Sequence, residues 1–231
     1  MVVVILGLAA EMIGDRTAAE NHAAGMARIV DLRGGLQMLR FDNPRLPAKV
    51  CRLSNVWRDL EEFAKLGNIA SQTGRKLQPN IFSEVMVSIL YRLLALSPES
   101  VSENAFRLGM MAFTASIFFR WRDMKQRQAY LDESFRDALM EMKNAFVQPP
   151  STVLLWLLVI WRTNSVQGGG DEAIEEWLLE VMGGLGICSW PELHRTLKSV
   201  LWIDCLFDAS SQRILEPILG KSARKEAEAG S

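Results

Sequence analysis

Apolar residues recur every three or four positions along most of this chain, and this spacing constrains the fold more than any other feature. The clearest example runs from Ile81 to Leu94, where eight apolar residues share one helical face and Glu84, Ser88 and Arg92 lie off it. We find no segment that alternates between apolar and polar residues, as a half-buried strand would. The chain is therefore predicted to be all-α.

Short connections rich in glycine, proline and capping residues separate these periodic segments. We expect about ten helices in one globular domain spanning residues 1–219, followed by a polar, disordered tail over residues 220–231. The expected helices cover residues 2–13, 16–33, 49–67, 81–94, 98–122, 131–146, 151–162, 171–182, 189–202 and 209–219.

Three helix starts are predicted from capping residues. Ser97 and Pro98 suit the cap and first position of one helix, and Asp171 suits the cap of another. Ser189 and Glu192 have the spacing of a capping box, in which each side chain satisfies a backbone N–H at the helix start.

Two apolar runs were compared with membrane and targeting segments. Val2–Ala10 has no preceding positive charge and is followed by Glu11, so we do not expect a signal peptide. Val153–Trp161 is far shorter than the roughly 20 residues that a membrane span needs. We expect it to be a helix that is buried on all sides.

The charge balance argues against a protein that binds DNA or an anionic membrane by itself. The chain has 26 Lys and Arg against 27 Asp and Glu, for a net charge of −1. Proteins that bind DNA directly usually need clustered positive charge, because contacts to phosphates supply much of the affinity.

The cysteines and histidines predict no catalytic, metal or cofactor site. Cys51, Cys188 and Cys205 lack the paired spacing of zinc sites, and free thiols are typical of the cytosol or nucleus. His194 follows Cys188 by six residues, a spacing that neither supports nor excludes a Cys–His pair. We interpret them as a buried thiol and an imidazole on a helix surface. His22 is the second of the two histidines.

Glycines and aromatic residues also have structural interpretations. Gly34 and Gly35 follow a predicted helix instead of a strand, so they fit a helix end better than a phosphate-binding loop. The seven tryptophans are expected to be core residues more than the lining of a ligand pocket. Asp59 is expected on a solvated helix face.

Five segments, spread over residues 2–217, together resemble the regulatory helical region of fungal-specific transcription factors that carry a zinc cluster. The first segment is His22–Gly25 (HAAG) with Leu32–Leu36 (LRGGL), and the second is Trp57–Leu60 (WRDL). The other three are Glu103–Phe113 (ENAFRLGMMAF), Pro150–Ile160, which contains LLWLL, and Ser189–Leu193 (SWPEL) with Leu201 and Trp202. The motif residues, which we expect to be mainly structural, are His22, Gly25, Arg33, Gly34, Gly35, Trp57, Asp59, Arg107, Trp156, Ser189, Trp190, Glu192 and Trp202.

The resemblance implies a regulatory domain and no enzyme. It implies a nuclear protein that contacts other proteins of the transcription machinery, or a small effector. The six-cysteine cluster through which full-length relatives contact DNA has no counterpart in this sequence. Direct DNA binding is therefore not implied, whether the chain is a relative without the cluster or a truncated gene product. A small-molecule-binding protein with a tryptophan-lined pocket, an unrecognised helical enzyme and a cytoplasmic location remain the alternatives.

Overall fold

The computed structural model describes residues 53–75, 79–121, 129–147, 149–164 and 171–229, together with Thr17 and Asn21. Within these residues the chain is all-helical and has no strand, as predicted. The helices expected over residues 2–13 and 16–33 lie outside this part, so the total of about ten stays a prediction. The eight helices of the described part are α4 (Leu53–Gln72), α5 (Pro79–Ala95), α6 (Val101–Trp121), α7 (Ala129–Asn144), α8 (Ser151–Asn164), α9 (Glu172–Gly184), α10 (Trp190–Val200) and α11 (Asp204–Ala229).

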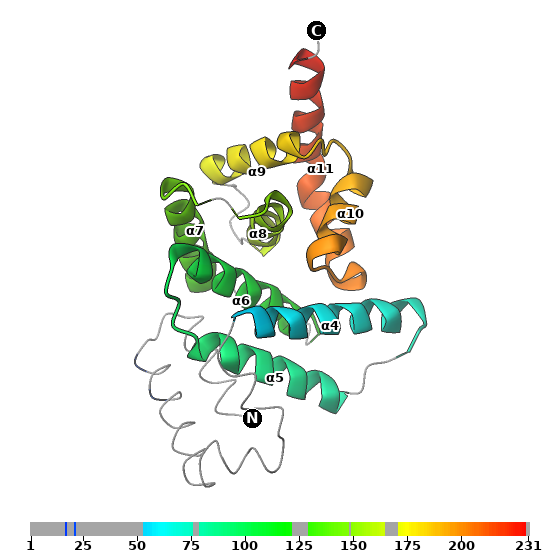
Figure 1. The fold of residues 1–231 in the computed structure, drawn as a ribbon. Helices are drawn as coiled ribbons and strands as arrows, with labels where there is room; N and C mark the ends of the chain where they lie inside the picture. Colours follow the sequence, from blue (N-terminus) through cyan, green and yellow to red (C-terminus); the bar gives the residue numbers. More distant parts are fainter. Residues whose placement is uncertain are drawn as a thin grey trace.

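Helix α8 occupies the centre of the fold, seen nearly end-on in Figure 1, and it packs against α6, α7, α9, α10 and α11. Every residue from Leu154 to Trp161 is buried. Because a helix that is apolar all round must be covered on every side, the other helices surround it. The prediction for Val153–Trp161 is thereby confirmed for residues 154–161. Among the described helices, none combines the length and apolarity that crossing a membrane requires.

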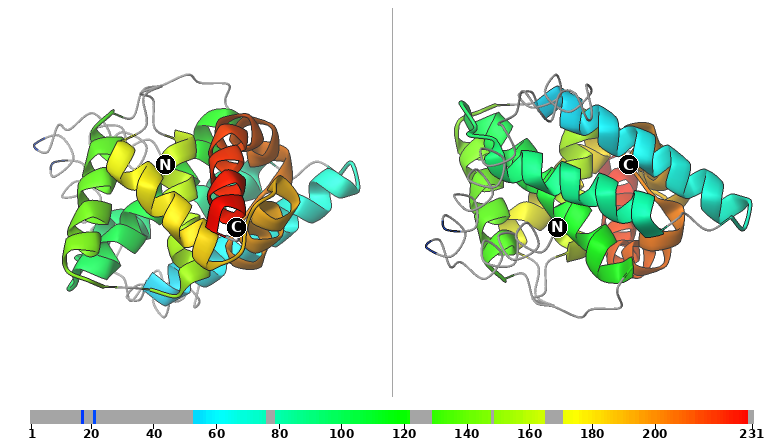
Figure 2. Two further views of the ribbon diagram at one scale, coloured as in Figure 1. Left: turned by 90° about the horizontal axis from the view of Figure 1, so that it is seen from above. Right: turned by 90° about the horizontal axis from the view of Figure 1, so that it is seen from below.

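Helices α4 and α5 lie side by side, and α6 packs against both (Figure 2). Helix α6 also approaches α8 closely at Gly109. A β-carbon at Gly109 would lie 2.5 Å from Cδ2 of the buried Leu157 and 3.2 Å from the ring of Phe135. The absence of a side chain at this position therefore sets how closely α6 and α8 can pack.

The start of α6 differs from the prediction. The helix begins at Val101, three residues after Pro98, and its cap is Ser100 instead of Ser97. The Ser100 hydroxyl accepts a hydrogen bond from the Glu103 N–H at 3.2 Å, and the Glu103 carboxylate accepts one from the Glu99 N–H at 2.9 Å. Ser100 and Glu103 have the spacing of a capping box, which Ser97 lacks.

Helix α9 begins as predicted, whereas α11 does not. The Asp171 carboxylate accepts a hydrogen bond from the Ala173 N–H at 3.0 Å, which confirms Asp171 as the cap of α9. Helix α11 starts at Asp204, before the expected residue 209, and it continues to Ala229 through most of the expected tail. Residues 220–229 consist largely of alanine, lysine, arginine and glutamate, which are strong helix formers.

Three helices end in the same type of turn, a Schellman motif, which places one residue in the left-handed conformation. That residue is Gly74 after α4 and Gly186 after α9, with φ angles of 64° and 63°. After α7 it is Phe146, with φ 54°. The Phe146 and Val147 N–H groups bond the carbonyls of residues 143 and 142, as the motif requires. The Phe146 side chain is 89% exposed, so a bulky apolar residue occupies a position that favours glycine.

Candidate functional site

The motif residues Trp57, Trp156 and Trp202 join helices that are distant in the sequence. The Trp156 indole is fully buried, and its Nε1–H donates to the Leu201 carbonyl at 2.6 Å. Trp57, from α4, packs edge-on against it with ring centroids 5.1 Å apart. Trp156 and Trp202 are both core residues, as expected. Trp156 thus links α4, α8 and the end of α10.

Asp59 was expected on a solvated face, and this expectation was wrong. Its carboxylate lies 2.7 Å from the Arg92 guanidinium, and the two side chains are only 14% and 8% exposed. The ion pair connects α4 to α5. A pair this buried is costly to break on one side, because the remaining charge would be left without its counter-ion.

The predicted capping box at the start of α10 is present. The Glu192 carboxylate accepts hydrogen bonds from the Ser189 hydroxyl at 2.8 Å and from the Cys188 and Ser189 N–H groups at 3.0 Å. The Ser189 hydroxyl and then these backbone donors hold the pKa of Glu192 below its usual value. Trp190 stacks on the imidazole of His194, one turn further along α10. The SWPEL segment therefore builds the helix that carries His194.

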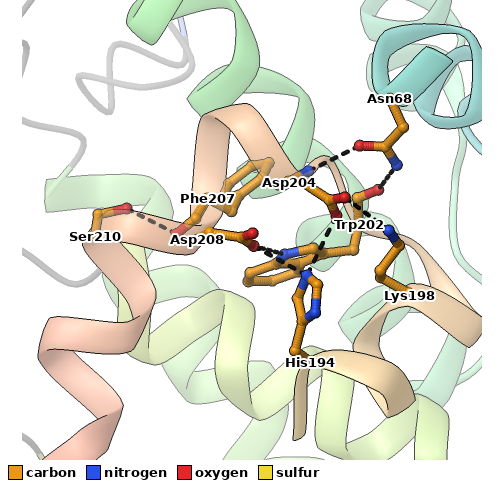
Figure 3. A network of polar contacts seen from close by, with 8 residues as sticks. All are labelled: Asn68, His194, Lys198, Trp202, Asp204, Phe207, Asp208 and Ser210. Carbon is orange, nitrogen blue, oxygen red and sulfur yellow. Dashed lines mark hydrogen bonds and ion pairs between the residues drawn. The ribbon is translucent and has the colours of Figure 1, made fainter. Parts of the chain in front are cut away.

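A polar cluster lies where α10 meets the start of α11 (Figure 3). Asp204 and Asp208 stand one turn apart on α11. The Nε2 atom of His194 lies 3.3 Å from Asp204 Oδ1 and 3.2 Å from Asp208 Oδ1. All three side chains are partly exposed, at 25%, 25% and 34% respectively. We call the following residues the α10–α11 cluster: Asn68, His194, Lys198, Trp202, Asp204 and Asp208.

Neighbouring donors hold both carboxylates of the α10–α11 cluster in place. The Trp202 Nε1–H donates to Asp208 Oδ1 at 2.7 Å, and Lys198 Nζ donates to Asp204 Oδ2 at 2.6 Å. Asn68, from α4, accepts from the Asp204 N–H at 2.9 Å and donates to the Trp202 carbonyl at 2.8 Å. The turn that presents the carboxylates is thus fixed to α4.

The donor atoms of this cluster are of the kind that bind metal ions. One ligand atom from each of His194, Asp204 and Asp208 lies within 4.8 Å of the other two. The two aspartates beside His194 were not predicted from the sequence, in which Cys188 was the neighbour considered for His194. They come from the helix after the turn at residues 201–203, and a turn of that shape is not encoded in spacing alone. The sequence signal was a pair of aspartates four residues apart, but the predicted helix began only at residue 209, after both of them.

A second feature is a pocket of about 620 Å³ between the start of α4, the α5–α6 connection and α6. Arg107 lies in its wall, and its Nη2 donates to the Asn104 side chain at 3.3 Å. The wall mixes apolar and charged groups, and within the part of the chain that the structure describes no tryptophan lines it. The lining residues are Leu53, Ser54, Leu96, Ser97, Pro98, Glu99, Glu103 and Arg107.

The N-terminal motif residues, His22, Gly25, Arg33, Gly34 and Gly35, lie outside the described residues. Comparisons with protein-family models, with curated proteins and with solved structures found no match to this chain.

Proposed function

We propose that this chain is the regulatory domain of a fungal transcription factor-like protein, acting in the nucleus by contacts with other proteins or a small effector. The observation that carries the proposal is the resemblance of five ordered segments to that family. Four described motif residues lie at contacts between helices or at a helix start, namely Trp57, Trp156, Glu192 and Trp202. Residues that hold a shared fold together are expected in such positions.

Two surfaces support a role in binding. The pocket beside α6 presents Glu99, Glu103 and Arg107 with apolar neighbours, which suits a small polar effector better than a flat aromatic one. The exposed ring of Phe146, with the half-exposed Val147, is an apolar point that a protein partner could cover. The alternative of a tryptophan-lined pocket has less support, because Trp156 and Trp202 are buried in the core.

The net charge of −1 supports regulation without direct binding to DNA. A mobility-shift titration at physiological salt should therefore show no sequence-dependent shift with the chain alone. Nanomolar, sequence-dependent binding would contradict this part of the proposal.

Tethering tests the regulatory part. The chain is fused to a heterologous DNA-binding domain, and transcription of a reporter is compared with that given by the DNA-binding domain alone. We expect the fusion to raise or lower transcription severalfold. Equal transcription from both proteins, at equal abundance, would contradict a regulatory role.

A further inference from the structure

We propose that His194, Asp204 and Asp208 form a binding site for a divalent transition-metal ion, with Zn²⁺ as the best fit. This site uses none of the three cysteines, so the spacing argument against a cysteine zinc site does not apply to it. Metal binding here does not depend on the proposed regulatory role.

The distances within the triad fit a shared ion. Nε2 of His194 faces two carboxylate oxygens at 3.2 and 3.3 Å. Each distance is long but acceptable for an N–H···O hydrogen bond, which spans about 2.7–3.2 Å, but one N–H cannot point at two oxygens equally well. In a tetrahedral zinc site with bonds of about 2.0–2.1 Å, neighbouring ligand atoms are separated by about 3.3 Å. Nε2 is therefore as far from each of the two oxygens as two ligands of one zinc ion are from each other, and all three ligand atoms lie within 4.8 Å of one another.

The chemistry of the donors favours zinc over the hard cations. One imidazole and two carboxylates are ligands that Zn²⁺ accepts, whereas Mg²⁺ and Ca²⁺ prefer sites built from oxygen alone. A three-ligand site leaves the fourth position to water or to a group on a partner. Partial exposure of all three side chains gives an ion a path from solvent.

A neighbouring donor orients one ligand of the triad. The Trp202 Nε1–H donates to Asp208 Oδ1, and hydrogen bonds of this type orient metal ligands. The two aspartates stand four residues apart on one helix, where like charges repel each other. Lys198 pairs with Asp204, whereas Asp208 contacts the Trp202 N–H and the His194 ring. A cation bound by the neutral imidazole and both carboxylates would offset the charge of Asp208.

Two features limit the affinity. The ammonium of Lys198 competes with a cation for Asp204, and the start of α11 carries the positive end of the helix dipole. Removing Lys198 should therefore tighten metal binding, although it removes a hydrogen bond of the folded protein. Loss of Lys198 should thus remove a stabilising hydrogen bond and yet raise the affinity for the metal. An ordinary surface ion pair would show only the first of these two effects.

The test is a calorimetric titration of the metal-free protein with zinc chloride, in a buffer that does not bind zinc. The wild-type chain should bind one Zn²⁺. His194→Ala and Asp208→Asn should weaken that binding by at least about tenfold. His22→Ala and Cys205→Ser are the matched controls, since they change the other histidine and the cysteine beside Asp204. Both should bind as the wild type does.

Lys198→Gln provides a gain of function that a misfolded protein would not show, and it should bind Zn²⁺ more tightly than the wild type. Circular dichroism confirms that each variant is folded. The proposal is overturned if the wild type binds no zinc, if His194→Ala binds it unchanged, or if only Cys205→Ser loses it.

Discussion

The indole of Trp156 contacts three different parts of the core. It meets Trp57 and Phe113 with ring centroids 5.1 and 5.8 Å away, and it donates its N–H to the carbonyl of Leu201. We expect Trp156→Ala to lower the free energy of unfolding by about 3–5 kcal/mol, because it leaves a large cavity. Urea unfolding measures this loss. Trp156→Phe keeps most of the volume and loses the hydrogen bond, so it should cost clearly less. Equal urea midpoints for Trp156→Ala and the wild type would contradict the central position of this residue.

Gly109 offers a second test of the same packing, because it sets the distance between α6 and α8. Gly109→Val forces new atoms against the buried Leu157 and should destabilise the protein by about 1–3 kcal/mol. Gly183→Val is the matched control, since a β-carbon at Gly183 meets no atom of another described helix within 4 Å. Thermal unfolding compares the two variants. If both shift the melting temperature equally, the close approach at Gly109 is not a constraint.

Single residues also show where prediction from sequence stops. The burial of Trp156 followed from its place in an apolar run, and the cap at Asp171 followed from local spacing. The burial of Asp59 was missed, because its counter-ion Arg92 belongs to the next helix. The neighbours of His194 were missed for the same reason. Local patterns identify which residues face inward, whereas the partner of a polar residue depends on how helices pack.

At the scale of the helix, the three Schellman ends form an internal comparison. Phe146 and Gly186 both adopt the left-handed backbone conformation, which is strained for phenylalanine and unstrained for glycine. Phe146→Gly should therefore stabilise the protein by about 1 kcal/mol, since the exposed ring contributes little packing. Gly186→Phe should destabilise it by a similar amount. Chemical unfolding of the two variants decides this, and a destabilised Phe146→Gly would show that the ring contributes to the fold.

The start of α9 links stability to pH. Burial opposes ionisation of Asp171, but the hydrogen bond and charge of Arg136, together with the Ala173 and Ile174 N–H groups, outweigh it and hold the pKa of Asp171 below its usual value. A lowered carboxyl pKa stabilises the fold above the pKa of the unfolded chain, and this contribution is lost as the pH falls through the folded value.

Asp171→Asn tests this link, because asparagine caps a helix about as well as aspartate. The variant should be about 0.5–1 kcal/mol less stable than the wild type at pH 7, since Arg136 is 43% exposed and solvent screens the pair. Below about pH 4 the difference should shrink. Unfolding curves recorded from pH 7 to pH 3 measure both quantities. A constant difference across this range would rule out the ion pair as its source.

Element by element, the helices were more predictable than their ends. Apolar periodicity, or a capping residue where the periodicity is weaker, indicated each of the eight described helices. The start of α6 was wrong by three residues, because two serines could serve as the cap and only Ser100 has Glu103 at the matching position. The predicted end of α11 was too early. The polar composition of residues 220–229 is common in disordered tails, but most of these residues also favour a helix.

At the scale of the whole molecule, the described residues form a helical body built around α8. We propose binding at three places on it, namely the pocket beside α6, the α10–α11 cluster and the exposed Phe146. The function of such a body depends on its being folded. Short peptide segments that act in transcription need no folded core. A core substitution should therefore abolish the activity of a folded regulatory domain and leave that of a short peptide segment unchanged.

The most direct measurement is reporter transcription from the tethered chain, made for the wild type, Trp156→Phe and Trp156→Ala at equal abundance. We predict that the wild type changes transcription, that Trp156→Phe largely retains this effect, and that Trp156→Ala loses it at temperatures where its lowered stability leaves it unfolded. An unfolded Trp156→Ala variant that keeps the full effect would contradict regulation by the folded domain, and so would a wild type without any effect.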